Sequence, residues 1–236
     1  MARTTSFIFI LLLTFAATAA AQADSRSYWG VTGSFVPTWK VQSNVTYLYG
    51  DADALNISGG EFTVGVARGK TYGGDWGVTY LHRTFKQGSY IDQGVGTTCV
   101  NNDCIELGTR YMLDTVTLNG IEGHKFVNFV TIKKRAQIGM IFGGGVAWES
   151  GVMEGTYTRM SGWTPNGGIV VEQGTEQAKY TDVFLSGTLS VVPLGQVEVA
   201  ANVILAPGLK VRFSGGLNFP GYQVARISAV YLIGAR

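Results

Sequence analysis

The sequence predicts an all-β protein, an eight-stranded antiparallel up-and-down barrel that crosses a membrane. Three observations predict it. Hydrophobic and polar residues alternate with a period of two through most of the chain, as in strands whose two faces meet different surroundings. Hydrophobic residues make up 46% of the chain, yet no apolar run beyond the N-terminal region could cross a bilayer as a helix. The connections between the predicted strands alternate between short and long, as the two rims of a membrane barrel require.

The composition excludes several other classes of protein. Charged residues make up only 14% of the chain and aromatic residues 12%, whereas disordered chains are rich in charge and poor in aromatic residues. The formal net charge is +2, and the longest basic run is Lys133-Lys134-Arg135, so we expect no nucleic-acid partner. A helical repeat or coiled coil would be rich in Ala, Glu, Lys and Leu, whereas this chain has 33 glycines.

The N-terminal residues have the pattern of a secretory signal peptide. Arg3 supplies the positive charge, Phe7 to Phe15 form a short apolar region, and Ala21-Gln22-Ala23 is a suitable cleavage site. A membrane-anchoring helix would need about 20 apolar residues. We therefore expect a signal peptide over residues 1–23 and one barrel domain over residues 24–236, with no separate periplasmic domain.

Eight strands are expected, and the clearest alternation runs from Val197 to Phe213. Odd positions there are apolar, and even positions, such as Glu198 and Asn202, are small or polar. The fourth strand is the least regular, because Gly120 to Gly123 suggest a bulge. The expected strands are Tyr28–Trp39, Ile57–Arg68, Trp76–Phe85, Met112–Val130, Ala136–Trp148, Tyr180–Val192, Val197–Phe213 and Val224–Ile233.

The predicted connections place all the short turns at one rim of the barrel and the long loops at the other. The short links are Gly69–Asp75, Thr131–Arg135 and Pro193–Gln196. The long links are Lys40–Asn56, Lys86–Tyr111 and Glu149–Lys179, with a more modest loop at Gly215–Gln223. Within the third long link, Glu154–Arg159 and Gly168–Glu172 are expected to form a hairpin that protrudes beyond the membrane.

Together, these features resemble the small bacterial outer-membrane barrels of the OmpA/OmpX/OmpW type. The resemblance is architectural and covers the whole mature chain. The last strand carries Ile227, Ala229, Tyr231 and Ile233 in alternation, followed by Gly234-Ala235-Arg236 with no terminal aromatic residue. The resemblance implies a bacterial outer-membrane location, contact with outer-membrane lipid and lipopolysaccharide, and insertion by the barrel assembly machinery. We expect a monomer.

Alternation alone does not say which face of the sheet points outward, since a soluble lipocalin-like barrel turns its apolar face inward. The polar face here holds few long charged side chains, which suits a narrow interior better than a surface in water. Aromatic residues also gather near the predicted strand ends, as in the two aromatic girdles of membrane barrels. Those expected near the short turns are Trp29, Trp76 and Tyr231, and those near the long loops are Trp39, Trp148, Tyr180 and Phe213.

A few charged residues fall on the face predicted to line the interior. They are Glu61, Arg83, Lys125, Asp182, Glu198, Lys210, Arg212 and Arg226. A hairpin centred on Tyr72 would place Glu61 opposite Arg83, and we expect the two to pair because an unpaired charge there is costly. These charges form either a polar plug that fixes strand register or a charged constriction that selects small solutes. An eight-stranded barrel is narrow enough for side chains to fill it, which favours the plug.

Cys99 and Cys104 are expected to form a disulfide in the second long loop, because the chain is exported and the two residues are close in sequence. A metal site would need further ligands at a suitable spacing, and His82 and His124 do not provide them. We predict no metal and no cofactor.

The sequence favours a structural or surface-exposed role over catalysis. Some outer-membrane barrels are lipid A hydrolases or proteases with histidine-based sites, but this chain has only two histidines and none of the nucleophile-elbow, dinucleotide or phosphate-loop motifs. We expect no enzyme and no catalytic residues. The alternatives are a narrow porin-like channel for small solutes and a soluble, secreted lipocalin-like binding barrel.

Overall fold

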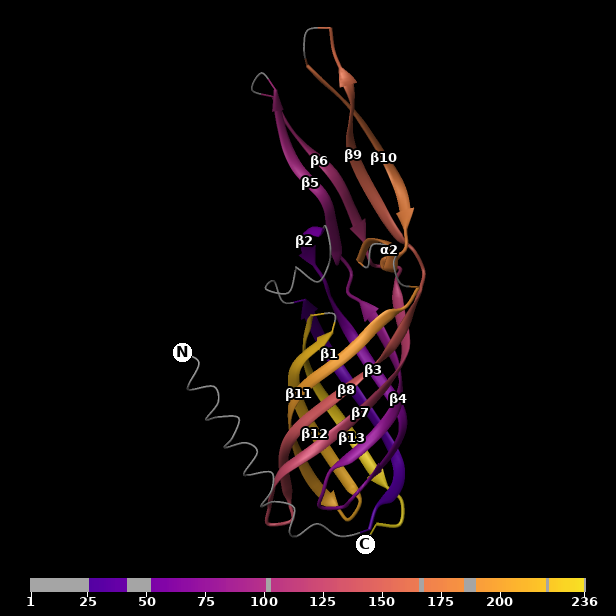
Figure 1. Cartoon of the computed structure of the whole chain (residues 1–236), viewed down its shortest axis with the longest axis vertical. Coiled ribbons are helices and arrows are strands. Elements are labelled where there is room, and N and C mark those ends of the chain that lie inside the picture. The colour runs from indigo at the N-terminus through magenta and orange to yellow at the C-terminus, as the bar shows by residue number, and fades with distance from the viewer. Residues whose placement is uncertain are drawn as a thin grey trace, which may run out of the picture.

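The structure is a computed structural model that describes residues 26–41, 52–100, 103–165, 168–184, 190–219 and 221–235. The expected signal peptide, residues 1–23, lies outside the described residues. The chain forms a closed antiparallel barrel of eight strands and a second sheet of five strands (Figure 1). The predicted fold class is confirmed.

The eight barrel strands pair in the order β1-β13-β12-β11-β8-β7-β4-β3, and β3 pairs with β1 to close the barrel. Every neighbouring pair is antiparallel. The strands are β1 (Tyr28–Val41), β3 (Ser58–Gly69), β4 (Asp75–Phe85), β7 (Thr117–Ile132), β8 (Ala136–Ser150), β11 (Val192–Ala206), β12 (Leu209–Phe219) and β13 (Tyr222–Leu232).

The long connections build the second sheet, here called the outer sheet, which extends beyond one end of the barrel (Figure 1). Its strand order is β10-β9-β6-β5-β2, and a short helix, α2, lies between it and the barrel. The elements are β2 (Ala52–Asn56), β5 (Tyr90–Val100), β6 (Asp103–Met112), β9 (Met153–Trp163), β10 (Ile169–Ala178) and α2 (Tyr180–Phe184). The expected protruding hairpin is β9 and β10. No helix in the described ranges is long and apolar enough to span a membrane.

The number of barrel strands was predicted correctly, but two of the eight expected segments were wrong. The segment Tyr180–Val192 begins with helix α2, and the expected strand Val197–Phe213 is a hairpin of β11 and β12 that turns at Pro207 and Gly208. The proposed short link Pro193–Gln196 lies inside β11.

The alternation hides this hairpin for a geometric reason. Val203 pairs with Val211 and Asn202 with Arg212, so paired residues on the two strands have the same parity and share a face. The register shifts between Ile204 and Ala206, and this bulge offsets the change of parity that a two-residue turn would cause. Gly208 takes a positive φ of 80° in the turn.

The fourth expected strand also had wrong boundaries. Met112 ends β6 of the outer sheet, and the barrel strand is β7. Its register shifts between Asn128 and Val130, whereas Gly120 to Gly123 pair regularly with β8. The expected loop Gly215–Gln223 is shorter than predicted, because β12 continues to Phe219 and β13 begins at Tyr222.

The barrel wall has an apolar outer surface and, over most of its length, a polar inner one. On β3, Phe62, Val64 and Val66 are exposed, whereas Glu61 and Thr63 are buried inside. Each of the eight strands contributes exposed apolar residues, among them Val31, Val66, Val78, Ile121, Ile138, Val199, Phe213 and Ile227. A soluble lipocalin-like barrel would have the opposite arrangement, so that alternative is wrong.

Candidate functional site

The interior contains a network of charges near the short turns, here called the short-turn cluster. Arg212 donates to both carboxylate oxygens of Asp75, at 2.8 and 2.7 Å. Lys210 lies 3.5 Å from the same carboxylate and donates to the carbonyl oxygens of Lys70 and Gly73, at 2.6 and 3.0 Å. These carbonyls belong to the turn between β3 and β4, so Lys210 ties that turn to the end of the barrel. The charges are buried but paired and hydrogen-bonded, as a low-dielectric interior requires.

A second network, the middle cluster, joins β3, β4, β11 and β13. Arg83 lies 2.6 Å from Glu61, and Arg226 lies 3.0 Å from the other oxygen of Glu61. Arg226 also pairs with Glu198 at 3.2 Å and donates to the hydroxyl of Ser34 at 3.1 Å. The expected pairing of Glu61 with Arg83 is therefore present, as part of a larger network that ties distant strands together.

The barrel buries equal numbers of carboxyl groups and basic groups. Within the described barrel, four carboxylates and four cations are buried: Glu61, Asp75, Glu122 and Glu198, with Arg83, Lys210, Arg212 and Arg226. Between the two clusters lies a cavity of about 10 Å³, bordered among others by Glu122, His124, Arg212 and Arg226. That volume is enough for about one water molecule.

An apolar cap covers the end of the interior that faces the outer sheet. Trp39 packs against Tyr222 and Phe85, with ring centres 4.4 and 5.5 Å apart. Helix α2 adds Tyr180, whose hydroxyl lies 2.6 Å from that of Tyr222. The cap also includes Val36, Leu81, Leu118, Val183, Val192, Leu194 and Val224, all buried. The guanidinium of Arg83 lies 4.5 Å from the ring centre of Tyr222, which joins the cap to the middle cluster.

Two residues expected inside the barrel lie elsewhere. Asp182 is exposed on α2, because the segment that was predicted as a strand is a helix there. Lys125 is exposed on the outer wall, since the even-numbered residues of β7, such as Glu122 and Phe126, face inward. The other six expected interior charges, Glu61, Arg83, Glu198, Lys210, Arg212 and Arg226, are buried in the two clusters.

Three aromatic residues expected in the girdles are placed differently. Trp39 is only 1% exposed, because the register of β1 shifts between Val36 and Trp39 and turns its side chain inward. Tyr180 is buried in the cap. Phe213 does face outward, but it lies four residues from the start of β12 and therefore nearer the short turns than predicted.

The other expected girdle residues lie on the outer wall near the strand ends. Trp29 and Trp76 contact each other edge to face at the short-turn end, with ring centres 5.5 Å apart, and Tyr231 is exposed near the end of β13. Trp148 is exposed near the opposite end, on β8. Aromatic rings at both levels suit the two interfaces of a bilayer.

Sequence reasoning missed Asp75 and Glu122 as interior groups. The predicted third strand began at Trp76, one residue too late, although Asp75 shares the odd parity of Arg83. Glu122 was assigned to a bulge that does not occur, although Leu118, Glu122 and Phe126 form an even-numbered buried series. Strict parity counting along both strands would have found these two carboxylates.

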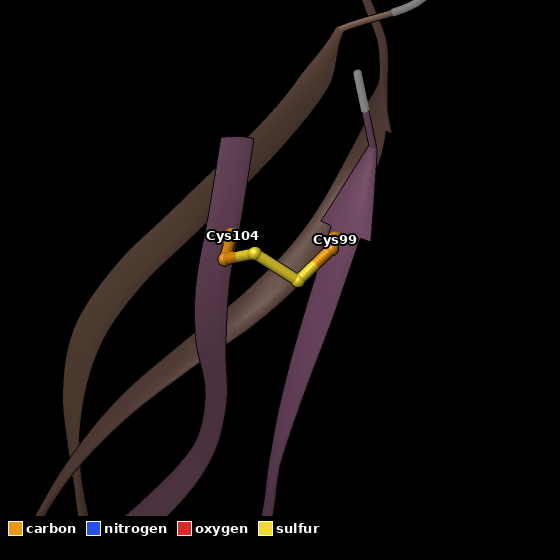
Figure 2. The surroundings of a disulfide bond; sticks show 2 residues. All are labelled: Cys99 and Cys104. Carbon is orange, nitrogen blue, oxygen red and sulfur yellow. A yellow bond between two sulfur atoms is a disulfide. The ribbon is translucent and has the colours of Figure 1, made fainter. Parts of the chain in front are cut away.

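The outer sheet is held together by polar contacts and a disulfide. Arg110 donates to both oxygens of Asp92, each at 2.6 Å, and lies over the ring of Tyr90. Cys99 and Cys104 face each other on β5 and β6, and they form the expected disulfide (Figure 2). A hollow of about 190 Å³ lies between β5, β6 and β9, bordered by Asp92, Val95, Glu106, Leu107, Gly108, Arg110, Thr156 and Thr158.

Tyr111 and Glu176 form a coupled pair across the outer sheet. The hydroxyl of Tyr111 donates to Glu176, and Arg159 lies 2.6 Å from the other carboxylate oxygen. Burial, together with this hydrogen bond, raises the pKa of Tyr111 to about 12. The hydrogen bond from Tyr111, helped by Arg159, lowers the pKa of Glu176 below its usual range.

The two histidines lie on opposite sides of the barrel wall. His82 is on the outward-facing side of β4, next to Phe62 and 2.8 Å from the amide oxygen of Asn119. His124 borders the small interior cavity. Among the described residues, no group of three or more His, Cys, Asp or Glu side chains could hold a metal ion.

Comparisons with known proteins found no family model and no curated protein that matches this sequence. Among solved structures, one match is Ail, the attachment invasion locus protein of Yersinia pestis, crystallised with the heparin analogue sucrose octasulfate. The identity is 8% and the TM-score 0.32, and the match covers 87% of this chain and 98% of Ail. By its own closed sheet, apolar outer wall and polar interior, the chain is a small eight-stranded barrel of the outer-membrane type.

Proposed function

We propose that this protein is a bacterial outer-membrane barrel that does not conduct solutes and that holds the outer sheet at the cell surface. One observation carries the proposal: apolar residues are exposed on all eight strands, while the charges are buried in the interior. In a bilayer the apolar outer face contacts lipid, and the polar side chains stay inside the barrel. A closed barrel also leaves no unpaired backbone groups at a sheet edge.

Three features support a non-conducting interior. The short-turn cluster, the middle cluster and the apolar cap follow one another along the barrel axis, and each links several strands. The cavity between the two clusters holds about one water molecule, which is far less than a solute pathway needs. We infer that the interior charges fix strand register and stability.

The outer sheet supports a role at the cell surface. Its contacts, Asp92 with Arg110, Glu176 with Tyr111, and the disulfide, join its strands to one another. The hollow beside Asp92 and Arg110 is polar and open, as suits contact with a polar surface molecule. The proposed partners are outer-membrane lipid, lipopolysaccharide and the barrel assembly machinery, which would recognise β13. The proposed oligomeric state is a monomer.

Fractionation and electrophoresis test the location. The protein should sediment with the outer membrane and migrate as a compact species unless it is boiled. Recovery in the soluble periplasmic fraction, with one gel position before and after boiling, would contradict the proposal.

Planar-bilayer recording tests the closed interior. Purified protein should insert without discrete current steps at neutral pH, while a known porin measured in parallel gives them. Steady steps from the unmodified protein would instead support the narrow-channel alternative.

A further inference from the structure

The short-turn end of the barrel exposes a run of cations. Lys133, Lys134 and Arg135 form the turn between β7 and β8, and all three are exposed. Asp75, the carboxylate at this end among the described residues, is buried and paired with Arg212, so it does not neutralise the exposed cations. This rim therefore presents positive charge to whatever surrounds it.

The turn holds these charges in a defined place. Lys133 and Lys134 have positive φ values of 47° and 56°, a conformation that favours Gly, Asn or Asp. Both lysines therefore occupy positions that Gly, Asn or Asp would take with less backbone strain. The amide of Ile204 donates to the carbonyl of Arg135 at 2.8 Å, which fixes the turn beside β11.

An apolar groove begins on the outer wall just beyond this turn. Ala201 pairs with Ile138 on one side and with Phe213 on the other, so a small residue lies between two large ones. With Gly215 and Val199, these residues border a hollow of about 350 Å³. We call this hollow the groove; Val199 beside it is 63% exposed.

The distance between the cations and the groove matches the layers of a bilayer. Ile138 follows Arg135 by three residues, about 10 Å along a strand. With the usual tilt of a barrel strand, this is about 7–8 Å of depth. The headgroup layer on each side of a bilayer is about 5–8 Å thick. A phosphate at the turn would thus place the start of its acyl chain at the groove.

We propose that the β7–β8 turn and the groove bind one anionic phospholipid of the periplasmic leaflet. Its phosphate contacts Lys133, Lys134 and Arg135, and one acyl chain lies along Ala201 between Ile138 and Phe213. The site rests on the proposed function, since it needs the barrel in a membrane with its short turns on the periplasmic side. The positive rim selects an anionic headgroup, and the groove selects a lipid over a soluble phosphate.

Native mass spectrometry of the full mature chain, released from mixed micelles, tests this site. The probes are phosphatidylglycerol and phosphatidylcholine with identical acyl chains. The unmodified protein should retain one phosphatidylglycerol in preference to phosphatidylcholine. Replacing Lys133, Lys134 and Arg135 with Gln should weaken that retention by about fivefold for each cation removed. Ala201→Phe, which fills the groove, should also weaken it.

Two matched controls separate a site from general attraction. Arg68→Gln removes an exposed cation from another part of the same rim, and Ala229→Phe enlarges an exposed residue of β13 outside the groove. Both should retain the lipid like the unmodified protein. Equal loss in Arg68→Gln and in the turn variants would overturn the proposal, as would full retention by Ala201→Phe. Lipid A, added as a third probe, should be retained less than phosphatidylglycerol, and equal retention of the two would overturn the assignment to the periplasmic leaflet.

Electrophoresis without boiling, run on every variant, separates failure of the site from failure of the proposed function. A compact, membrane-inserted protein that retains both phospholipids equally contradicts only the lipid site. A protein that never inserts into vesicles contradicts the outer-membrane function itself.

Discussion

Glu61 of β3 and Arg83 of β4 lie directly opposite each other and form an ion pair of 2.6 Å, with side chains 0% and 1% exposed. Arg226 of β13 reaches the other oxygen of Glu61 at 3.0 Å. One carboxylate inside the barrel therefore pairs with two cations, one from the adjacent strand β4 and one from β13, and Arg226 has Glu198 as a second partner. These contacts join the β3–β4 hairpin to β13, and they make Glu61 the centre of the middle cluster.

Removing Glu61 should destabilise the barrel more than removing Arg83. Glu61→Gln leaves Arg83 without its paired carboxylate and Arg226 with Glu198 alone, whereas Arg83→Met leaves Glu61 paired with Arg226. Breaking a buried pair from one side costs about 3–5 kcal/mol. We expect Glu61→Gln to lose about that much free energy of unfolding in urea titrations of the micelle-bound protein, and Arg83→Met to lose less.

The double variant Glu61→Gln/Arg83→Met is the control for that comparison. It should recover part of the loss of Glu61→Gln, because one uncompensated cation is gone. Strict additivity of the two single changes would show that the charges act independently, contrary to the network described.

Opening one end of the barrel should not make it conduct. Lys210→Ala loosens the short-turn cluster, and Tyr180→Ala removes part of the apolar cap, but each leaves the other barrier in place. We expect each single variant to stay silent in planar bilayers, and the double variant to stay silent as well, because the middle cluster remains in place. Steps from Lys210→Ala alone would mean that the cap does not close the barrel.

The disulfide should matter for the outer hairpin and not for the barrel. Cys99 and Cys104 close a ring of only a few residues, for which the chain-entropy estimate is about 2 kcal/mol. Replacing both with Ser should not change the compact gel species or the temperature at which heating converts it to the unfolded species. Limited proteolysis should then cut the β5–β6 hairpin faster, and the unmodified protein under reducing conditions should behave in the same way.

Acid should loosen the outer sheet through Glu176. Its pKa in the folded protein lies below the ordinary value of 4.5, so its ionised form stabilises the sheet above that pH. This stabilisation is lost as pH falls below about 4.5 and passes through the lowered pKa. Amide exchange in β10 should rise over that range, and Glu176→Gln should remove the pH dependence. Exchange that rises equally in the variant would exclude Glu176 as its cause.

Alkali should act on the same contact through Tyr111. Its pKa is raised to about 12, so the protonated phenol stabilises the sheet fully below pH 10, and this contribution is lost between about pH 10 and 12. The difference in absorbance at about 295 nm between the unmodified protein and Tyr111→Phe isolates this tyrosine. A midpoint near 10 would contradict the buried hydrogen bond with Glu176.

The alternation of apolar and polar residues predicted most of the barrel, because along a strand odd-numbered and even-numbered side chains point to opposite faces of the wall. Glu61 and Arg83 could be placed opposite each other in this way. Parity fails wherever the register shifts. The bulge near Pro37 turns Trp39 inward, and the bulge at Leu205 hides the turn at Pro207-Gly208. The Pro-Gly pair itself was the available signal for that turn.

The cap and the outer sheet could not be predicted in the same way. Tyr180 lies in a short helix whose position depends on contacts with Phe85 and Tyr222, residues far away in sequence. The outer sheet joins strands from three separate long links. Its β5–β6 and β9–β10 hairpins are local in sequence, but the pairings of β2 with β5 and of β6 with β9 are not. Long-range pairing of this kind leaves little trace in the periodicity of any one segment.

Lipid accessibility along β3 tests the central claim most directly. Nitroxide labels at Val64→Cys, Ala67→Cys and Val66→Cys report whether lipid-soluble oxygen or a water-soluble nickel complex reaches each position. Val64 and Val66 are exposed on the outer wall, and Ala67 is buried in the interior. We predict strong relaxation by oxygen at positions 64 and 66 and little at position 67. Strong relaxation by the nickel complex at positions 64 and 66, with none by oxygen, would mean that water surrounds this wall, and the membrane barrel would be wrong.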